Sequence, residues 1–247
     1  MRAIVFGGSG VLGSHVADAL QERGFDVRIF DLRPSPHLRP GQEMLVGDIL
    51  DEAGVARAID GCQYLYNFAG VADIEDANRR PVDTVRLNVL GTAILLNAAI
   101  AAKVERFVYA STVYVYSQAG GFYRCSKQAA ELYIEMYQEV HGLPYTILRY
   151  GSLYGPRADE KNVVRRYLTE ALLHGRVVCY GDGEEVREYI HVEDAARSSV
   201  DILSPDFKNE HVVVTGHQPM KVRALLETIT EILNKEIEIV FEPPDST

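Results

Sequence analysis

The sequence is short of positive charge. Its 247 residues include 25 lysines and arginines against 35 aspartates and glutamates, a formal net charge of −10. Nucleic-acid and anionic-membrane surfaces need clustered Lys and Arg, so this balance argues against either partner. A small basic pocket for one phosphate ester stays compatible with it. Apolar residues make up 47% of the chain, which is typical of a soluble globular protein with one core, or one core and a small lobe.

Cysteine and long apolar runs are also scarce. Cys62, Cys125 and Cys179 lie far apart and are odd in number, which predicts neither a disulfide framework nor a metal site. The early apolar run Ala3–Phe6 breaks at Gly7, so we expect no signal peptide. No apolar stretch is long enough to predict a transmembrane segment. A reducing cytoplasm is the expected location.

Strand and helix patterns alternate along the first 150 residues. Short buried apolar runs predict strands, and apolar residues at helical spacing predict helices. The expected strands are 2–6, 27–30, 43–46, 64–67, 106–110 and 144–149, and the expected helices are 11–23, 52–59, 82–102 and 123–141. Repeated units of this kind predict an α/β fold with a Rossmann-like, doubly wound parallel sheet.

The regular alternation of strand and helix patterns ends after Tyr150, and residues 151–159 look like a loop. The later pattern predicts helices at 163–174, 192–203 and 222–233, and strands at 177–180, 211–215 and 236–241. We expect a Rossmann domain over 1–150, to which 188–216 returns. The segments 151–187 and 217–247 are expected to form a small C-terminal substrate lobe, with a frayed tail at 242–247.

A glycine-rich loop follows the first expected strand. Gly7, Gly10 and Gly13 let the backbone turn tightly and approach a pyrophosphate, and the next helix presents free N–H groups to it. Asp31 ends the second expected strand, 18 positions after Gly13, where a carboxylate suits a ribose 2′-hydroxyl and repels a 2′-phosphate. This favours NAD over NADP. The alternatives are a plain glycine turn for the loop and a turn-forming role for Asp31.

Tyr123 and Lys127 stand four residues apart at the start of an expected helix, which puts both side chains on one face. A neighbouring ammonium stabilises a phenolate over a phenol. Ser111 and Thr112 end the preceding strand, at the edge where parallel sheets hold their ligands. Such a hydroxyl and Tyr–Lys pair can remove a proton from a substrate alcohol while hydride leaves its carbon. The alternative is a helix with an exposed lysine and a half-buried tyrosine.

Together these motifs make the chain similar to the extended short-chain dehydrogenase/reductase superfamily, and within it to the NAD-dependent nucleotide-sugar epimerase/dehydratase branch, which is UDP-glucose 4-epimerase-like. The matching positions occur in family order along almost the whole chain. They are Gly7–Gly13, Asp31, Gly47–Ile49, Asn67–Gly70, Asn88, Ser111–Tyr116, Tyr123–Lys127, Leu148–Arg157 and Arg187–Asp194.

The resemblance implies a role for each matching residue. Thr112, Tyr123 and Lys127 would be catalytic: Tyr123 as the acid/base, Thr112 as a hydrogen-bond partner of the reacting hydroxyl, and Lys127 as the group that tunes Tyr123. The residues implied for NAD are Gly7, Gly10, Val11, Leu12, Gly13, Asp31, Asp48, Ile49, Phe68, Ala69, Gly70, Asn88, Ser111, Tyr123, Lys127 and Tyr150. Those implied for a nucleotide-diphosphate sugar, most simply a UDP-sugar, are Thr112, Ser152, Asn162 and Arg187.

Departures from the family pattern bear on the reaction. Val113 and Tyr114 stand where the 4,6-dehydratases and decarboxylases carry an acidic pair, which favours a 4-epimerase. In that hypothesis the sugar is oxidised at C4 to a 4-keto sugar, turns over, and is reduced again on the opposite face. The resemblance also implies a homodimer formed through the helices 82–102 and 123–141.

Two other functions stay open. The same residues can serve another NAD-dependent reaction of a sugar nucleotide, as in a UDP-glucuronate decarboxylase, a dehydratase or a reductase. The segment between Thr112 and Tyr123 is much shorter than in typical epimerases, which also leaves a non-catalytic NAD-binding sensor open. An intact Tyr–Lys pair argues against the sensor.

Overall fold

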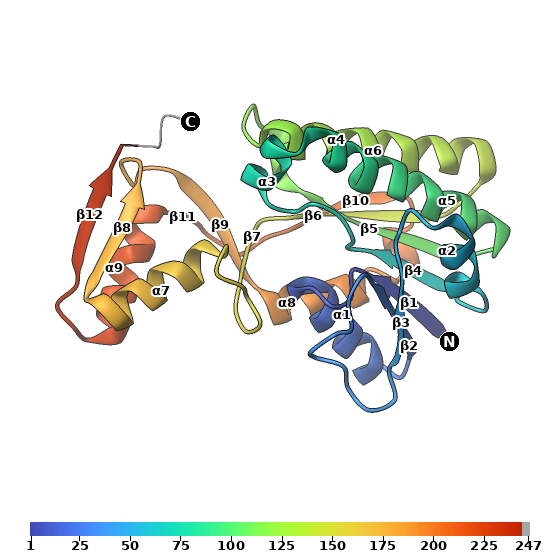
Figure 1. Ribbon diagram of the computed structural model, residues 1–247, viewed down its shortest axis with the longest axis horizontal. Helices are drawn as coiled ribbons and strands as arrows, with labels where there is room; N and C mark the ends of the chain where they lie inside the picture. The colour runs from blue at the N-terminus through green and yellow to red at the C-terminus, as the bar shows by residue number, and fades with distance from the viewer. Residues whose placement is uncertain (244–247) are drawn as a thin grey trace. The chain divides into compact units, whose positions relative to one another are not determined.

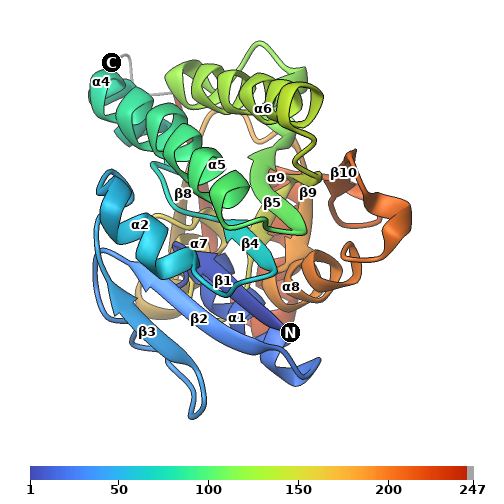
Figure 2. The ribbon, with the colours of Figure 1, turned by 90° about the vertical axis from the view of Figure 1, so that its right-hand side faces the viewer.

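The structure is a computed structural model that describes residues 1–243 (Figures 1 and 2). The predicted fraying concerns 242–247, of which 244–247 lie outside the described residues. The chain divides into two compact units, Met1–Tyr150 with Glu193–Val214, and Gly151–Val192 with the chain from Thr215 onward. The segment that returns to the first unit is shorter than the 188–216 expected, because residues 186–191 pair within the second unit.

The first unit contains a seven-stranded parallel sheet with the order β10-β6-β5-β4-β1-β2-β3. Its strands are β1 (Arg2–Phe6), β2 (Asp26–Asp31), β3 (Glu43–Val46), β4 (Tyr64–Asn67), β5 (Arg106–Thr112), β6 (Tyr145–Tyr150) and β10 (Glu210–Val214). Strand β1 pairs with both β2 and β4, so the strand order reverses there. The carboxyl ends at such a reversal form the crevice in which doubly wound folds bind ligands. The predicted fold class is confirmed.

Helices cover both faces of this sheet. They are α1 (Val11–Glu22), α2 (Glu52–Ile59), α3 (Ile74–Arg79), α4 (Pro81–Thr84), the π-helix η1 (Val85–Leu90), α5 (Gly91–Ala101), the 3₁₀ turn η2 (Val113–Tyr116), α6 (Gly121–His141), α8 (Val192–Asp201) and the 3₁₀ turn η3 (Pro205–Phe207). In Figure 1, α1 and α8 lie on one face and α5 and α6 on the other. Figure 2 shows α5 and α6 side by side, with α2 next to α5.

The core lies between the strands and the helices α2, α5 and α6. Phe107 and Ile147 from the sheet and Leu95 and Leu96 from α5 are fully buried there. In a parallel sheet covered on both faces, each strand is a continuous apolar run in the sequence. For this reason the strands could be predicted from the sequence. The helical stretch 81–101 is long and apolar enough to cross a membrane by length and composition. Of its most apolar window, 44% is buried in the protein, and the α5 part packs in this core.

The second unit has its own small core. Strands β7 (Ser152–Tyr154), β9 (Val186–His191) and β11 (Pro219–Lys221) form one sheet, strands β8 (Arg176–Tyr180) and β12 (Glu238–Glu242) form a parallel pair, and the helices are α7 (Val163–His174) and α9 (Val222–Leu233). Tyr167, Val177, Leu226 and Ile229 are buried between the helices and the β8–β12 pair.

Several local predictions were wrong. Residues 151–159 are not all loop, because Ser152–Tyr154 pair with β9. The predicted single helix 82–102 contains the π-helix η1. Helix α3 was not predicted, although Asp73 precedes it and accepts a hydrogen bond from the Asp76 N–H at 2.8 Å. Such an aspartate is the usual signal for a helix start.

Candidate active site

The glycine loop lies at the strand reversal, between the ends of β1 and β4. Gly7 has φ +77°, and a Cβ built on it would lie 2.6 Å from the backbone nitrogen of Ala69. A Cβ on Gly13 would lie 2.3 Å from the Gly7 carbonyl oxygen. Both distances are too short for any side chain, so the sequence has glycine where the two loops and the start of α1 meet.

The start of α1 offers backbone donors. Gly10 precedes the helix with an extended backbone and makes no side-chain cap. The N–H groups of Val11, Leu12 and Gly13 therefore have neither an intrahelical partner nor a capping side chain. A helix start of this kind, reached by a loop without side chains, suits the pyrophosphate of a dinucleotide. The predicted residues fit that group.

Asp31 stands at the end of β2 beside this loop. Its Oδ2 accepts a hydrogen bond from the Ser9 N–H at 3.0 Å. The Ser9 hydroxyl in turn donates to the carbonyl oxygen of Arg33 at 2.8 Å. Asp31 thus fixes the glycine loop, a contact that the sequence argument did not anticipate, and it brings a carboxylate to the carboxyl edge of the sheet.

Asp48, Ile49, Phe68 and Tyr150 are also predicted to contact NAD, and their environments in the structure differ. Asp48 closes a turn by accepting a hydrogen bond from the Leu50 N–H at 2.9 Å, and Ile49 is buried in the core. Phe68 follows β4, and its ring centre lies 6.4 Å from that of Tyr150. The Tyr150 hydroxyl is hydrogen-bonded with Ser199, and burial raises the pKa of Tyr150 well above its ordinary value.

Asn88 fixes the segment that follows β4. Its amide nitrogen donates to the Val71 carbonyl oxygen and the Ser126 hydroxyl, both at 2.9 Å, and its amide oxygen accepts from the Val71 N–H at 2.7 Å. Gly70 is needed beside it, because a Cβ there would lie 2.3 Å from that amide oxygen. Asn88 lies in the π-helix η1. π-helical turns of this kind are frequent at functional sites.

Thr112, at the end of β5, lies near Tyr123 and Lys127, which are in the first two turns of α6. The Thr112 side chain is near enough to the Tyr123 hydroxyl to lower its pKa. The Lys127 Nζ donates to the carbonyl oxygen of Ala110 at 2.7 Å and lies 5.7 Å from the centre of the Tyr123 ring. Lys127 is 5% exposed, so the alternative of an exposed lysine was wrong.

Burial shifts both groups away from their ordinary titration. It raises the pKa of Tyr123 to about 12, and the Thr112 side chain acts in the opposite direction. Burial also lowers the pKa of Lys127 to about 8, against the negative charge of Glu131, which raises it. A lysine with this pKa exchanges its proton near neutral pH, which is the range useful for acid–base chemistry.

Ser111 is engaged in a contact that sequence reasoning missed. Its hydroxyl donates to Oε1 of Glu131 through a very short hydrogen bond. Glu131 also forms an ion pair with Arg149, with Arg149 Nη2 2.5 Å from Glu131 Oε2. The signal available in the sequence was spacing, since Glu131 follows Lys127 by one helical turn.

The residues expected to hold a sugar nucleotide belong to the second unit, apart from Thr112. Ser152 pairs with Tyr189 between β7 and β9. Asn162 caps α7, accepting from the Arg165 N–H at 3.1 Å, and donates to the Leu153 carbonyl oxygen at 2.7 Å. This gives Asn162 a structural role that the sequence argument did not assign.

Arg187 lies on β9 and forms an ion pair with Glu185 at 2.7 Å. Burial lowers the pKa of Arg187 from its ordinary value, but a guanidinium stays charged throughout the useful pH range. It therefore offers a positive charge and several fixed donors on the second unit.

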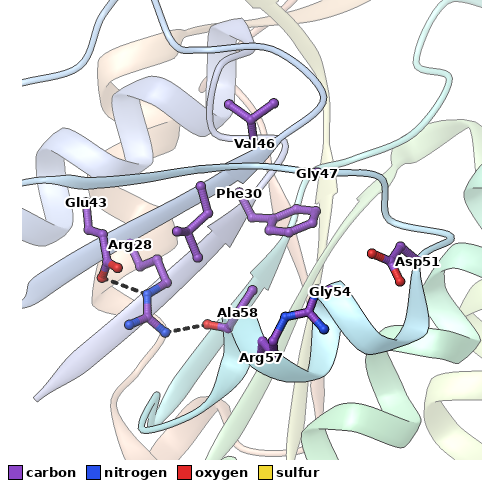
Figure 3. Close-up of a pocket in the computed structure, with 10 residues that line it drawn as sticks. Arg28, Phe30, Glu43, Val46, Gly47, Asp51, Gly54, Arg57 and Ala58 are labelled. Carbon is purple, nitrogen blue, oxygen red and sulfur yellow. Dashed lines mark hydrogen bonds and ion pairs between the residues drawn. The ribbon is translucent and has the colours of Figure 1, made fainter.

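Figure 3 shows a hollow of about 320 Å³ at the outer edge of the sheet, formed by β2, β3 and α2. Arg28 crosses it, pairing with Glu43 at 2.8 Å and donating to the Ala58 carbonyl oxygen at 2.5 Å. None of the residues predicted for the site lines this hollow. The candidate site is defined by the chemistry of its side chains and by the strand reversal.

The cysteines and acidic residues add no further site. Cys62 and Cys179 are buried, Cys125 is exposed, and all three are free thiols. Within residues 1–243, no group of three or more His, Cys, Asp or Glu side chains is placed to hold a metal ion.

A sequence profile of the family described as "NAD dependent epimerase/dehydratase family" matches residues 3–215. The chain belongs to this family. The predicted family is thereby confirmed, and with it the predicted cofactor, NAD, for which the family is named.

Relatives within this family carry out more than one reaction. A crystal structure of UDP-glucose 4-epimerase from Thermotoga maritima with UDP-glucose is 29% identical, with a TM-score of 0.92, covering 100% of this chain and 87% of that one. A UDP-N-acetyl-alpha-D-glucosaminuronate decarboxylase of Bacillus cytotoxicus is 24% identical over 98% of this chain and 83% of its own length. The dTDP-D-glucose 4,6-dehydratase of Mus musculus is 26% identical, over 95% and 73%.

Proposed function

We propose that the protein is a nucleotide-sugar 4-epimerase that binds NAD and acts on a UDP-sugar. The observation that carries the proposal is the group formed by Thr112, Tyr123 and Lys127, in which the Thr112 hydroxyl acts on the phenol and the Lys127 amine lies beside its ring. An epimerase needs one acid/base group that takes a proton from the sugar and returns it. This group offers one.

In this proposal NAD, when bound, would supply a hydride acceptor and donor for C4 of the sugar, so there would be no net oxidation. Tyr123, as phenolate, takes the proton of the 4-hydroxyl while Thr112 holds the oxygen of that group. The Lys127 ammonium stabilises the phenolate. When the 4-keto sugar is reduced again on its other face, Tyr123 returns the proton.

Residues of each unit are assigned to a ligand group. For NAD we assign the N–H groups at the start of α1 to the pyrophosphate and Asp31 to the adenosine ribose. Asn88 holds the loop beside the cofactor. For the sugar nucleotide we assign Arg187 to the diphosphate, because its planar, permanently charged group suits phosphate oxygens.

The segment η2 supports epimerisation over dehydration. It consists of Val113-Tyr114-Val115-Tyr116, so it has no carboxyl group with which to eliminate water from the ring. Relatives of known name include a decarboxylase and a dehydratase, and these are the rival outcomes of the test.

The test is incubation of the protein with UDP-glucose labelled with deuterium at C4. The proposal expects UDP-galactose to accumulate to a constant ratio, with the label kept at C4 and no lasting NADH. Release of CO₂ from UDP-glucuronate, or of a 4-keto-6-deoxy sugar, would assign one of the rival reactions. Tight NAD binding without conversion of any UDP-sugar would favour the sensor.

We also propose a homodimer in the cytoplasm. Helices α4, η1 and α6 pack against one another and leave large apolar side chains exposed. These are Val82, Val85, Leu90, Leu132, Tyr133, Met136 and Val140. Exposed large apolar side chains on packed helices are typical of an interface, and Met136→Glu is expected to give monomers in sedimentation velocity.

A further inference from the structure

Helix α6 contacts consecutive residues at the end of β5. Lys127 donates to the carbonyl oxygen of Ala110, and Glu131, one turn further along the helix, accepts from the hydroxyl of Ser111. Ser111 directly precedes Thr112, the residue that lowers the pKa of the phenol of the pair. The strand end that carries the active hydroxyl is therefore held to the helix by side chains from two successive turns.

Glu131 is a buried charge with several partners. It is 5% exposed, and both of its oxygens are engaged by Arg149, at 3.1 Å from Nε and 2.5 Å from Nη2. Arg149 is the register partner of Ser111 across β5 and β6. It also donates to the hydroxyl of Tyr116 in η2, and its guanidinium lies 4.7 Å from the centre of that ring. Glu131 thus connects α6, β5, β6 and η2.

We propose that Glu131 is a positioning residue for the reaction: through Ser111 and Arg149 it holds the end of β5 in place against α6, and it places a negative charge one helical turn from Lys127. The proposal deepens the epimerase assignment and rests on it. Glu131 itself lies behind the reacting groups and is assigned no contact with substrate.

The groups that face Lys127 come from two elements. The Tyr109 ring on β5 lies 4.8 Å from Nζ, and the Tyr123 ring on α6 lies 5.7 Å from it. Both are phenols, and burial raises the pKa of each. Burial lowers the pKa of Lys127, and the carboxylate of Glu131 raises it. Removing this carboxylate therefore makes Lys127 lose its proton at lower pH.

A buried ion pair also has a purely structural role, because removing one partner leaves the other charge uncompensated. The double variant Glu131→Gln with Arg149→Met separates the two roles, since it removes both charges. A structural role predicts that the double variant recovers the thermal stability and the activity together. The positioning role predicts that it recovers stability while the reaction stays impaired.

The experiment compares wild type, Glu131→Gln, the double variant and Glu135→Gln. The last is a matched control, because Glu135 lies one turn further along α6 and pairs with His211 at 2.9 Å. For Glu131→Gln we expect kcat with UDP-glucose to fall about ten- to a hundredfold with little change in KM. We expect the alkaline limb of its pH–rate profile to move to lower pH, and Glu135→Gln to match wild type.

A pH titration of ¹⁵N-lysine-labelled protein by NMR reads the charge of Lys127 without any reaction. An unchanged Lys127 titration in Glu131→Gln, or full recovery of kcat in the double variant, would overturn the proposal. If wild type itself converts no UDP-sugar, the epimerase assignment fails, and the titration still decides whether Glu131 controls the charge of Lys127.

Discussion

The side-chain nitrogen of Lys127 is held 2.7 Å from the carbonyl oxygen of Ala110 and 5.7 Å from the centre of the Tyr123 ring. It is buried to such an extent that its pKa falls to about 8. A protonated amine at this position costs folding free energy. That cost is typical of a group retained for function, because active sites keep charges that destabilise the fold.

Replacing Lys127 by Met should therefore stabilise the protein and abolish turnover. The pKa of Lys127 is lowered from 10.5 to about 8, so its cost is fully present below pH 8 and disappears as the pH rises towards 10.5. At pH 7 we expect Lys127→Met to raise the free energy of unfolding by about 1–3 kcal/mol. Urea denaturation at pH 7 and pH 10 measures this.

The gain from Lys127→Met should shrink at pH 10, where the wild-type amine is mostly neutral. Lys235→Met serves as the control, because Lys235 is exposed, and it should change the stability little at either pH. A Lys127→Met variant less stable than wild type at pH 7 would contradict the account of this site.

Asp31 should set the choice between NAD and NADP. Asp31→Asn removes the negative charge of the side chain. It keeps an oxygen that can accept the hydrogen bond from the Ser9 N–H, which is 3.0 Å long in the wild-type protein. We expect the affinity for NADP to rise about tenfold or more while NAD binding weakens, because the repulsion of a 2′-phosphate is relieved. Calorimetric titration with both dinucleotides measures the change.

Asp31→Leu is the companion variant, because it also removes the acceptor for Ser9. It should lose affinity for both dinucleotides as the glycine loop loosens. If Asp31→Asn leaves the ratio of the two affinities unchanged, Asp31 does not face the ribose.

Asn88 should be important for stability as well as for the site. Asn88→Ala leaves the N–H and carbonyl of Val71 without their partner in a buried place. We expect a loss of about 2–4 kcal/mol in the free energy of unfolding. Asn97→Ala is the control, since Asn97 is exposed and accepts one hydrogen bond from Tyr137, and it should cost about 1 kcal/mol or less. Equal losses in the two variants would show that the Asn88 contacts contribute little.

The sequence predicted the sheet of the first unit well, because each of its central strands is a short apolar run closed by a glycine or a polar residue. It predicted the Tyr–Lys pair for a similar reason, since a spacing of four residues on one helix has one geometric meaning. The short strands β7 and β11 could not be predicted from the sequence. Strands of three residues form because they pair with another strand, here β9, and they have no sequence pattern of their own.

The contacts of Glu131 could not be predicted from the sequence either. Glu131 follows Lys127 by one turn, but its partners Ser111 and Arg149 lie on two different strands, and only the strand register brings them together. Asn162 shows another limit of the sequence. The residue that the resemblance matched to a substrate contact also caps α7, which its type and position alone did not reveal.

The most direct measurement of the central claim is the turnover of Tyr123→Phe, which removes one hydroxyl and keeps the buried ring. The account predicts that conversion of UDP-glucose falls by about a thousandfold while the affinity for NAD and the melting temperature stay close to those of wild type. Turnover of Tyr123→Phe at the wild-type rate would contradict it, because the proton would then move without the phenol.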